Sequence, residues 1–281
     1  MKNILLPTDF SDNSWNAINY ALNFYKNTKC NFYLLHVNKF NDVIEDNSTI
    51  VSIQEKVDNI TIDQAKIELK LVLEKINKKF SNNKYHNFFT LIDADFFIES
   101  LRKYIVEKKI DVLVMGTKGA TAGLNKYIIG SNTTDAITKV KCTTLVVPEN
   151  AKFNRIKEIA FPTDFSLYNN LQLLQPITEI LDEKRSYIRI VNISKRTTEL
   201  NKSQKNSKEL LQDYFLNYNC SFHLLTNSKI QDAVQCFVDT NHIDLIAMPA
   251  KSLNYFQQML FHNRVEKNNY YKEVPFLVLH E

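Results

Sequence analysis

The chain has 281 residues, 44% of them hydrophobic and 23% charged, and its 35 basic and 31 acidic side chains give a formal net charge of +4. This is the composition of an ordinary soluble globular protein that is long enough for two domains. No apolar run reaches the roughly 18 residues of a membrane span, and the basic residues are scattered, so we expect no membrane partner and no specific nucleic-acid partner. The first apolar run ends at Pro7, which is too early for a secretory signal and predicts a cytoplasmic protein.

The predicted elements of the first half alternate between short apolar runs and helical patterns. Strands are expected at 4–6, 32–37, 88–92, 112–115 and 144–147, and helices at 14–25, 62–80, 96–108 and 132–140. Continuous apolar strands that alternate with helices favour a parallel sheet covered on both faces. The sequence therefore predicts an α/β fold.

A hexapeptide marks an internal repeat. Leu-Pro-Thr-Asp-Phe-Ser at 6–11 returns as Phe-Pro-Thr-Asp-Phe-Ser at 161–166, and the apolar runs 111–115 and 144–147 return at 244–248 and 276–279. In the second copy, strands are expected near residue 159 and at 188–193, 221–225, 245–248 and 276–279, with a mobile loop at 195–208. We place the two domains at 1–149 and 155–281.

The glycines are concentrated in one stretch. An average chain of this length carries about 20, but this one has four, Gly116, Gly119, Gly123 and Gly130, all within fifteen consecutive residues. Glycine lets a ligand approach the main chain without a Cβ in the way, so the four together favour a phosphate-binding loop. A plain loop with helix-capping glycines is the alternative.

The position of this stretch favours a ligand site. Ligands of parallel α/β sheets bind beyond the carboxyl ends of the strands, where Pro7-Thr8-Asp9 follows the first strand and Gly116 the fourth. If these strands are neighbours, the two loops meet. Gly130-Ser131-Asn132 opens the next helix, whose free N–H groups favour an anion. The hydroxyls of Ser131 and Thr133 would assist, Lys118 would lie near phosphates, and Asp9 could accept hydrogen bonds from a ribose.

With these residues the chain resembles the universal stress protein family, in tandem form, over essentially its whole length. Nucleotide-binding members carry Gly-x2-Gly-x9-Gly followed by Ser or Thr after the fourth strand, with an Asp closing the first. Here Gly116 and Gly119 are followed by ten residues rather than nine before Gly130-Ser131. The resemblance implies that Asp9 meets the ribose of ATP or another adenine nucleotide, bound with or without Mg²⁺. It also implies that the adenine is bordered by Thr8, Val37 and Met115 and the phosphates are held by Gly116, Gly119, Gly130, Ser131 and Asn132.

The resemblance further implies the architecture. Each copy would be a Rossmann-like domain of the adenine nucleotide α-hydrolase-like type, with a five-stranded parallel sheet of order 3-2-1-4-5. The copies would pair through their fifth strands, 144–147 against 276–279. Pairing of whole chains into a homodimer is left open.

The second copy serves as a control. At the matching loop it reads Met248-Pro249-Ala250-Lys251-Ser252, then nine residues, then His262-Asn263, with no glycine. Pro249 offers no N–H, so we predict that this copy does not bind nucleotide. Because it keeps the hexapeptide, that motif must also serve structure, most simply as a helix N-cap by its Asp or Ser.

Other chemistry finds little support in the sequence. The four cysteines form no CxxC pair and lie in or beside apolar segments, which favours reduced, buried thiols over metal ligands. His36, at the end of an apolar strand, is expected to be a satisfied buried or rim residue rather than a catalyst. Asp93 and Asp95 are expected to cap the helix that follows them. No catalytic residue is assigned, so we expect at most slow ATP hydrolysis. The alternatives are a nucleotide-independent interaction scaffold and, with less support, an adenylating enzyme.

Overall fold

The computed structural model describes residues 1–38, 50–80, 83–117, 131–165, 171–194, 199–226, 230–250 and 273–280. The chain forms two compact units, Met1–Gly116 and Thr117–Glu281, and each is described here by itself. These units are not the two sequence copies, because the end of the first copy falls in the second unit. The boundary placed between the copies at 149–155 stays a prediction.

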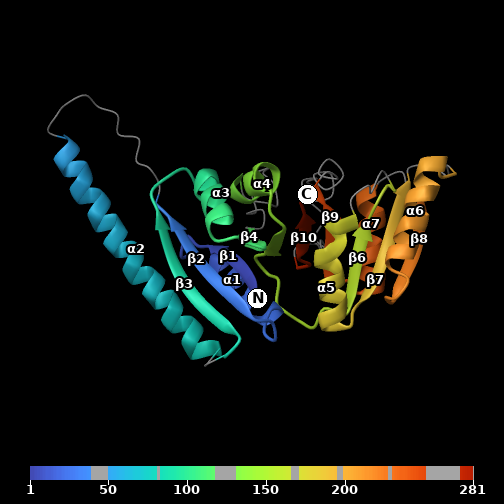
Figure 1. Ribbon diagram of the computed structural model, residues 1–281, viewed down its shortest axis with the longest axis horizontal. Coiled ribbons are helices and arrows are strands. Elements are labelled where there is room, and N and C mark those ends of the chain that lie inside the picture. Colours follow the sequence, from blue (N-terminus) through green and yellow to red (C-terminus); the bar gives the residue numbers. More distant parts are fainter. Residues whose placement is uncertain are drawn as a thin grey trace. The chain divides into compact units, whose positions relative to one another are not determined.

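The first unit is a parallel sheet whose strands are connected by helices (Figure 1). Its strand order is β3-β2-β1-β4, with β1 paired to both β2 and β4. The elements in chain order are β1 (Lys2–Pro7), α1 (Asp12–Phe24), β2 (Cys30–Val37), α2 (Ile50–Phe80), β3 (His86–Asp93), α3 (Phe97–Glu107) and β4 (Val112–Thr117). The predicted strands and helices are all present, and α2 begins earlier than the apolar stripe indicated.

Apolar spacing explains how the first helices cover the sheet. The face of α1 that includes Ile18, Ala21 and Leu22 is buried, as its sequence pattern predicts. On α2, Lys75 lies with its Nζ 3.9 Å from the ring centroid of Trp15 on α1, so the two helices are neighbours.

The second unit holds a complete five-stranded parallel sheet. Its order β8-β7-β6-β9-β10 corresponds to 3-2-1-4-5 in the second copy, which confirms the order that the resemblance implied there. The elements of the unit are α4 (Ser131–Lys139), β5 (Thr144–Pro148), β6 (Glu158–Pro162), η1 (Leu171–Leu174), α5 (Gln175–Lys184), β7 (Tyr187–Ser194), α6 (Lys202–Tyr214), β8 (Cys220–Thr226), α7 (Ile230–Asn241), β9 (Leu245–Pro249) and β10 (Phe276–Leu279).

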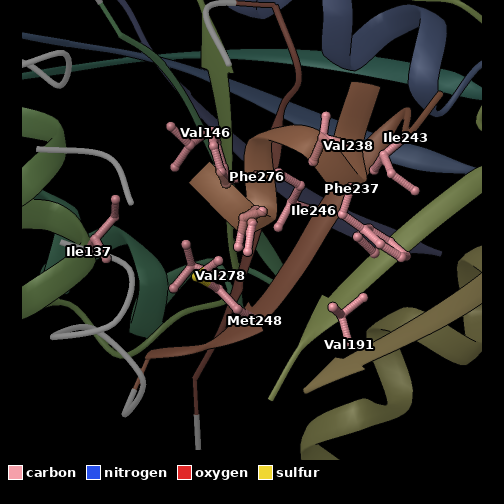
Figure 2. Close-up of a cluster of buried hydrophobic side chains, with 13 residues drawn as sticks. Ile137, Val146, Val191, Phe237, Val238, Ile243, Ile246, Met248, Phe276 and Val278 are labelled. Carbon is pink, nitrogen blue, oxygen red and sulfur yellow. The ribbon is translucent and has the colours of Figure 1, made fainter. Parts of the chain in front are cut away.

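The fifth strands of the two copies pair within this unit. β10 runs antiparallel to β5, with Phe276 opposite Val146 and Val278 opposite Thr144. Figure 2 shows the apolar cluster around this pairing, in which Ile137 of α4 and Phe237 of α7 join the strand residues. Antiparallel pairing of these strands therefore shares one core between elements of both copies.

The stretch 195–208 was predicted to be a mobile loop, and this was wrong for its second half. Helix α6 begins at Lys202, behind a capping box in which Asn201 Oδ1 accepts the Gln204 N–H (2.9 Å) and Gln204 Oε1 accepts the Asn201 N–H (3.0 Å). This reciprocal pair satisfies two helix-end donors, which stabilises a helix of otherwise polar composition. Residues 195–198 lie outside the described residues. Among the helices described, none combines the length and the apolarity needed to cross a bilayer.

Candidate functional site

The candidate site in the first unit lies where two neighbouring strands end. β1 and β4 run parallel with Ile4 opposite Val112 and Leu5 opposite Leu113, so the loop after Pro7 and the end of β4 at Gly116 reach the same edge of the sheet. A shared site for these two loops requires that β1 and β4 be neighbours, and they are. It is the position at which parallel α/β sheets collect ligands.

The loop after β1 is a tight turn held by Thr8. Its Oγ1 accepts the Phe10 N–H (3.0 Å) and lies 3.0 Å from the hydroxyl of Ser14, while its own N–H donates to the Leu35 carbonyl (2.8 Å). Phe10 has a φ of 64°, a left-handed conformation that the turn imposes on a bulky residue. Thr8 is therefore a buried structural residue, and its backbone positions Asp9.

Asp9 is exposed beside the start of α1. Its Oδ1 accepts both the Ser11 N–H (3.1 Å) and the Ser11 hydroxyl (2.5 Å). Burial raises the pKa of the Asp9 carboxyl, but the hydrogen bonds from Ser11 outweigh it and hold the pKa below its usual range. Ser11 is the N-cap of α1, accepting the Ser14 N–H (3.2 Å), so the Ser rather than the Asp caps the helix. Asp9 thus presents an ionised, oriented carboxylate.

His36 closes the β2 side of the turn. Its Nδ1 donates to the Thr8 carbonyl (2.8 Å), and its ring stacks on Phe10 with 4.4 Å between centroids. This confirms the prediction of a satisfied buried or rim residue. Val37, beside it at the end of β2, is half-buried.

Gly116 approaches the start of α1. A Cβ on this residue would lie 2.8 Å from the backbone oxygen of Asn13 and 2.9 Å from both its side-chain Nδ2 and Oδ1. The missing side chain of Gly116 is thus used by the protein itself, for close packing of a helix on a strand. Contact between the Gly116 main chain and phosphate stays a prediction.

Sequence reasoning missed Asn13, the second residue of α1. Its Oδ1 is buried and accepts no hydrogen bond from any described residue. Nothing in the local sequence distinguishes it from the other asparagines, because its environment is set by β4, about a hundred residues later. Only its place in the first turn of a helix that follows the Asp9 loop could have singled it out.

The remaining predicted site residues lie on β1, β4 and α4 or outside the described residues. Met115 is buried in β4, and Pro7 is half-buried at the end of β1. In the second unit, Ser131 begins α4 as predicted, Asn132 is exposed and Thr133 is buried. Lys118, Gly119, Gly123 and Gly130 lie outside the described residues. Within the described part of the chain, no cluster of three His, Cys, Asp or Glu side chains could hold a metal ion.

Comparison with known proteins decides the family. The model of the universal stress protein family matches residues 1–148, which is more than half of the chain. The chain belongs to the universal stress protein family. A universal stress protein from Methanocaldococcus jannaschii is 28% identical over 156 residues, covering 54% of this chain and 84% of the relative.

Solved structures agree on the fold. A universal stress protein from Archaeoglobus fulgidus matches with a TM-score of 0.59 at 14% identity, over 98% of this chain and 97% of its own. A functionally unknown protein from Pseudomonas aeruginosa matches with a TM-score of 0.56 at 12% identity, over 99% of this chain and 92% of its own. At such identities the likeness shows that the chain shares the universal stress protein fold and nothing about its ligands.

The second copy of this universal stress protein repeats the turn but not the glycine. Thr163 Oγ1 accepts the Phe165 N–H (3.0 Å), and Phe165 has a φ of 56°. Asn192 Nδ2 donates to the Thr163 carbonyl (2.9 Å), replacing the bond that His36 makes in the first copy. At the end of β9, Pro249 stands where the first copy has Gly116. The turn around Thr8 and Thr163 therefore forms in both copies, although only the first has a glycine at the end of the neighbouring strand.

Asp93 and Asp95 do not cap α3, contrary to the expectation. The N-cap of α3 is Phe96, which makes no side-chain capping bond. Asp93 Oδ2 instead pairs with Lys103 Nζ (3.1 Å), and Asp95 Oδ1 accepts the Phe96 N–H (2.6 Å). Asp95 lies one residue before the N-cap and Asp93 three residues before it, so neither is in the capping position.

Proposed function

We propose that the first copy binds an adenine nucleotide, ATP or a close relative, with or without Mg²⁺, at the end of β1 beside Asp9. The observation that carries this proposal is the pairing of β1 with β4, which brings Asp9 and Gly116 to one edge of the sheet. An exposed carboxylate held ionised by Ser11 suits a ribose, whose hydroxyls are hydrogen-bond donors. Family membership supports a nucleotide, and the glycine motif supports binding of its phosphates.

The residues divide into two groups in this proposal. Asp9 would meet the ribose, with Thr8, Val37 and Met115 bordering the base, and Pro7 would belong to the same site at the end of β1. The phosphates would be held by the residues that the family resemblance assigns, Gly116, Gly119, Gly130, Ser131 and Asn132, with Lys118 and Thr133 beside them. The second copy, with Pro249 in place of a glycine, would be a structural or regulatory partner that binds no nucleotide.

In the cell the protein would act as a cytoplasmic, nucleotide-responsive stress module rather than an enzyme. The described side chains around Asp9 supply hydrogen bonds and orientation, and the sequence assigns no catalytic residue. Hydrolysis would therefore be slow at most. Phosphate release measured over hours with the full chain tests this point, and multiple turnovers per minute would contradict it.

Isothermal titration of the full chain with ATP tests the binding proposal. We expect one binding site per chain. Binding should be lost or strongly weakened in Gly119→Val, because the valine side chain would keep the phosphates away from the main-chain N–H groups. Asp9→Asn, which keeps an oxygen for Ser11 but removes the charge, should weaken binding. The matched variant Asp164→Asn in the second copy should bind like the wild type. Absence of binding by the wild type, or undiminished binding by Gly119→Val, would end the proposal.

One observation favours a second candidate, a nucleotide-independent interaction scaffold of the same fold. The space left by Gly116 is taken by Asn13 of α1, so at least this glycine has a packing role. A ligand that binds only the folded state raises the melting temperature. A melting temperature unchanged by millimolar ATP, in a protein that still binds its protein partner, would therefore support the scaffold.

A further inference from the structure

Asn13 is a polar residue whose hydrogen bonding is incomplete. Its Oδ1 has no donor among the described residues although it is buried, and the carboxamide lies 2.9 Å from where a Gly116 Cβ would stand. Most buried polar atoms in folded proteins are paired, and an unpaired one costs free energy. An orphan of this kind calls for an explanation.

The position of Asn13 connects it to the candidate site. It follows Ser11, which holds Asp9, and precedes Ser14, which contacts Thr8. Gly116, against which its side chain rests, ends the strand next to β1. Asn13 thus stands between the Asp9 loop and the end of β4, the two segments assigned to the nucleotide.

We propose that Asn13 is a further ligand-positioning residue, whose Oδ1 accepts a hydrogen bond from an O–H donor of the bound nucleotide. This inference rests on the proposed function. The residue as a whole is only partly buried, and the last torsion of Asn is broad, so Oδ1 reaches the ligand by rotation without movement of α1.

The chemistry of the acceptor restricts what it meets. A carboxamide oxygen is repelled by phosphate oxygens, which are also acceptors, so Asn13 does not bind phosphate directly through Oδ1. Asp9 is assigned to the ribose and Gly116 to the phosphates, and Asn13 lies two residues after Ser11, which holds Asp9, and against Gly116. The sugar–phosphate part of the nucleotide is therefore the part that Asn13 would meet. Its O–H donors are a ribose hydroxyl and a water carried by the phosphate-bound Mg²⁺.

Two properties of the variant Asn13→Ala separate a ligand role from a structural one. Without nucleotide, the variant should melt at or above the wild-type temperature, because it loses an unsatisfied buried acceptor. With ATP and Mg²⁺, its dissociation constant should rise about tenfold, which corresponds to about 1.4 kcal/mol. Asn23→Ala, at the other end of the same helix, should bind like the wild type.

Analogues then identify the donor. If a ribose hydroxyl is the donor, the tenfold difference between wild type and Asn13→Ala disappears with 2′-deoxy-ATP or 3′-deoxy-ATP. If a cation-bound water is the donor, it disappears when EDTA replaces Mg²⁺. A difference that persists under every condition, or a lower melting temperature of ligand-free Asn13→Ala, would overturn the inference. Equal ATP binding by wild type and variant would overturn it while leaving the proposed function standing, whereas no binding by the wild type would remove the proposed function itself.

Discussion

Gly116→Ala tests whether the end of β4 is seated against α1 as tightly as the structure indicates. The new Cβ would lie 2.8 Å from the Asn13 backbone oxygen, whereas ordinary contact begins at 3.4 Å. The start of α1 must therefore move away by about 0.6 Å. That movement would stretch the contact between Thr8 and Ser14, now 3.0 Å, and the capping bond from Ser14 to Ser11, now 3.2 Å.

Two opposing effects set the change in the free energy of unfolding of Gly116→Ala. Forcing an extra methyl group into a packed site costs about 1–3 kcal/mol. Alanine regains roughly 0.5–1 kcal/mol over glycine in a strand, and no left-handed φ at Gly116 adds strain. We expect a net loss of about 1–2 kcal/mol, which lowers the melting temperature by about 3–6 °C for a domain-sized unit.

Thermal unfolding followed by far-UV circular dichroism measures this loss. Addition of Asn13→Ala to Gly116→Ala should recover little, because the closest contact is to the backbone oxygen, which the second change keeps. Wild-type stability of Gly116→Ala would refute the packing argument. The glycine would then have to be explained by a ligand alone.

Three further predictions concern ionisation and thiols. Ser11→Ala removes a donor to Asp9 and should raise its pKa toward the ordinary value, as read by carbon NMR titration. Because the pKa of Asp9 is lower in the folded state, its ionisation stabilises the fold above the unfolded-state pKa of about 3.9. This stabilisation is lost as pH falls through the folded-state pKa, so acid should destabilise Ser11→Ala less than the wild type. The pKa of His86 is lowered by burial, against a hydrogen bond from its Nε2 to the Tyr25 carbonyl that raises it. Stability should therefore fall as pH drops below about 6.5, and urea midpoints of His86→Gln should show a shallower fall; an identical slope would contradict this. Cys30 and Cys142 are buried as predicted, Cys236 is exposed, contrary to the prediction, and burial raises the pKa of Cys220 to about 11. A thiol reagent at about pH 8 should label one cysteine quickly, and Cys236→Ser should lose that fast phase; a fast phase that remains would assign it elsewhere.

The sequence by itself determined the elements and the repeat. Apolar periodicity depends on which face of each segment is buried, so it predicted the alternation of strands and helices in chain order. The returning hexapeptide predicted an internal repeat, and the structure gives Phe10 and Phe165 the same left-handed conformation. Where neighbours in the chain make the decisive contacts, the sequence was sufficient.

Only the tertiary structure decided which of the singled-out residues face one another. Periodicity could not show that Gly116 makes room for Asn13, because the two lie on separate elements that meet only after the sheet has formed. It could not choose Ser11 over Asp9 as the cap, since both side chains reach helix-end donors in principle and the turn around Thr8 orients them. Contacts between distant segments depend on the packing of whole elements, and that packing is what places an acidic group, a glycine and an unpaired amide at one end of β1.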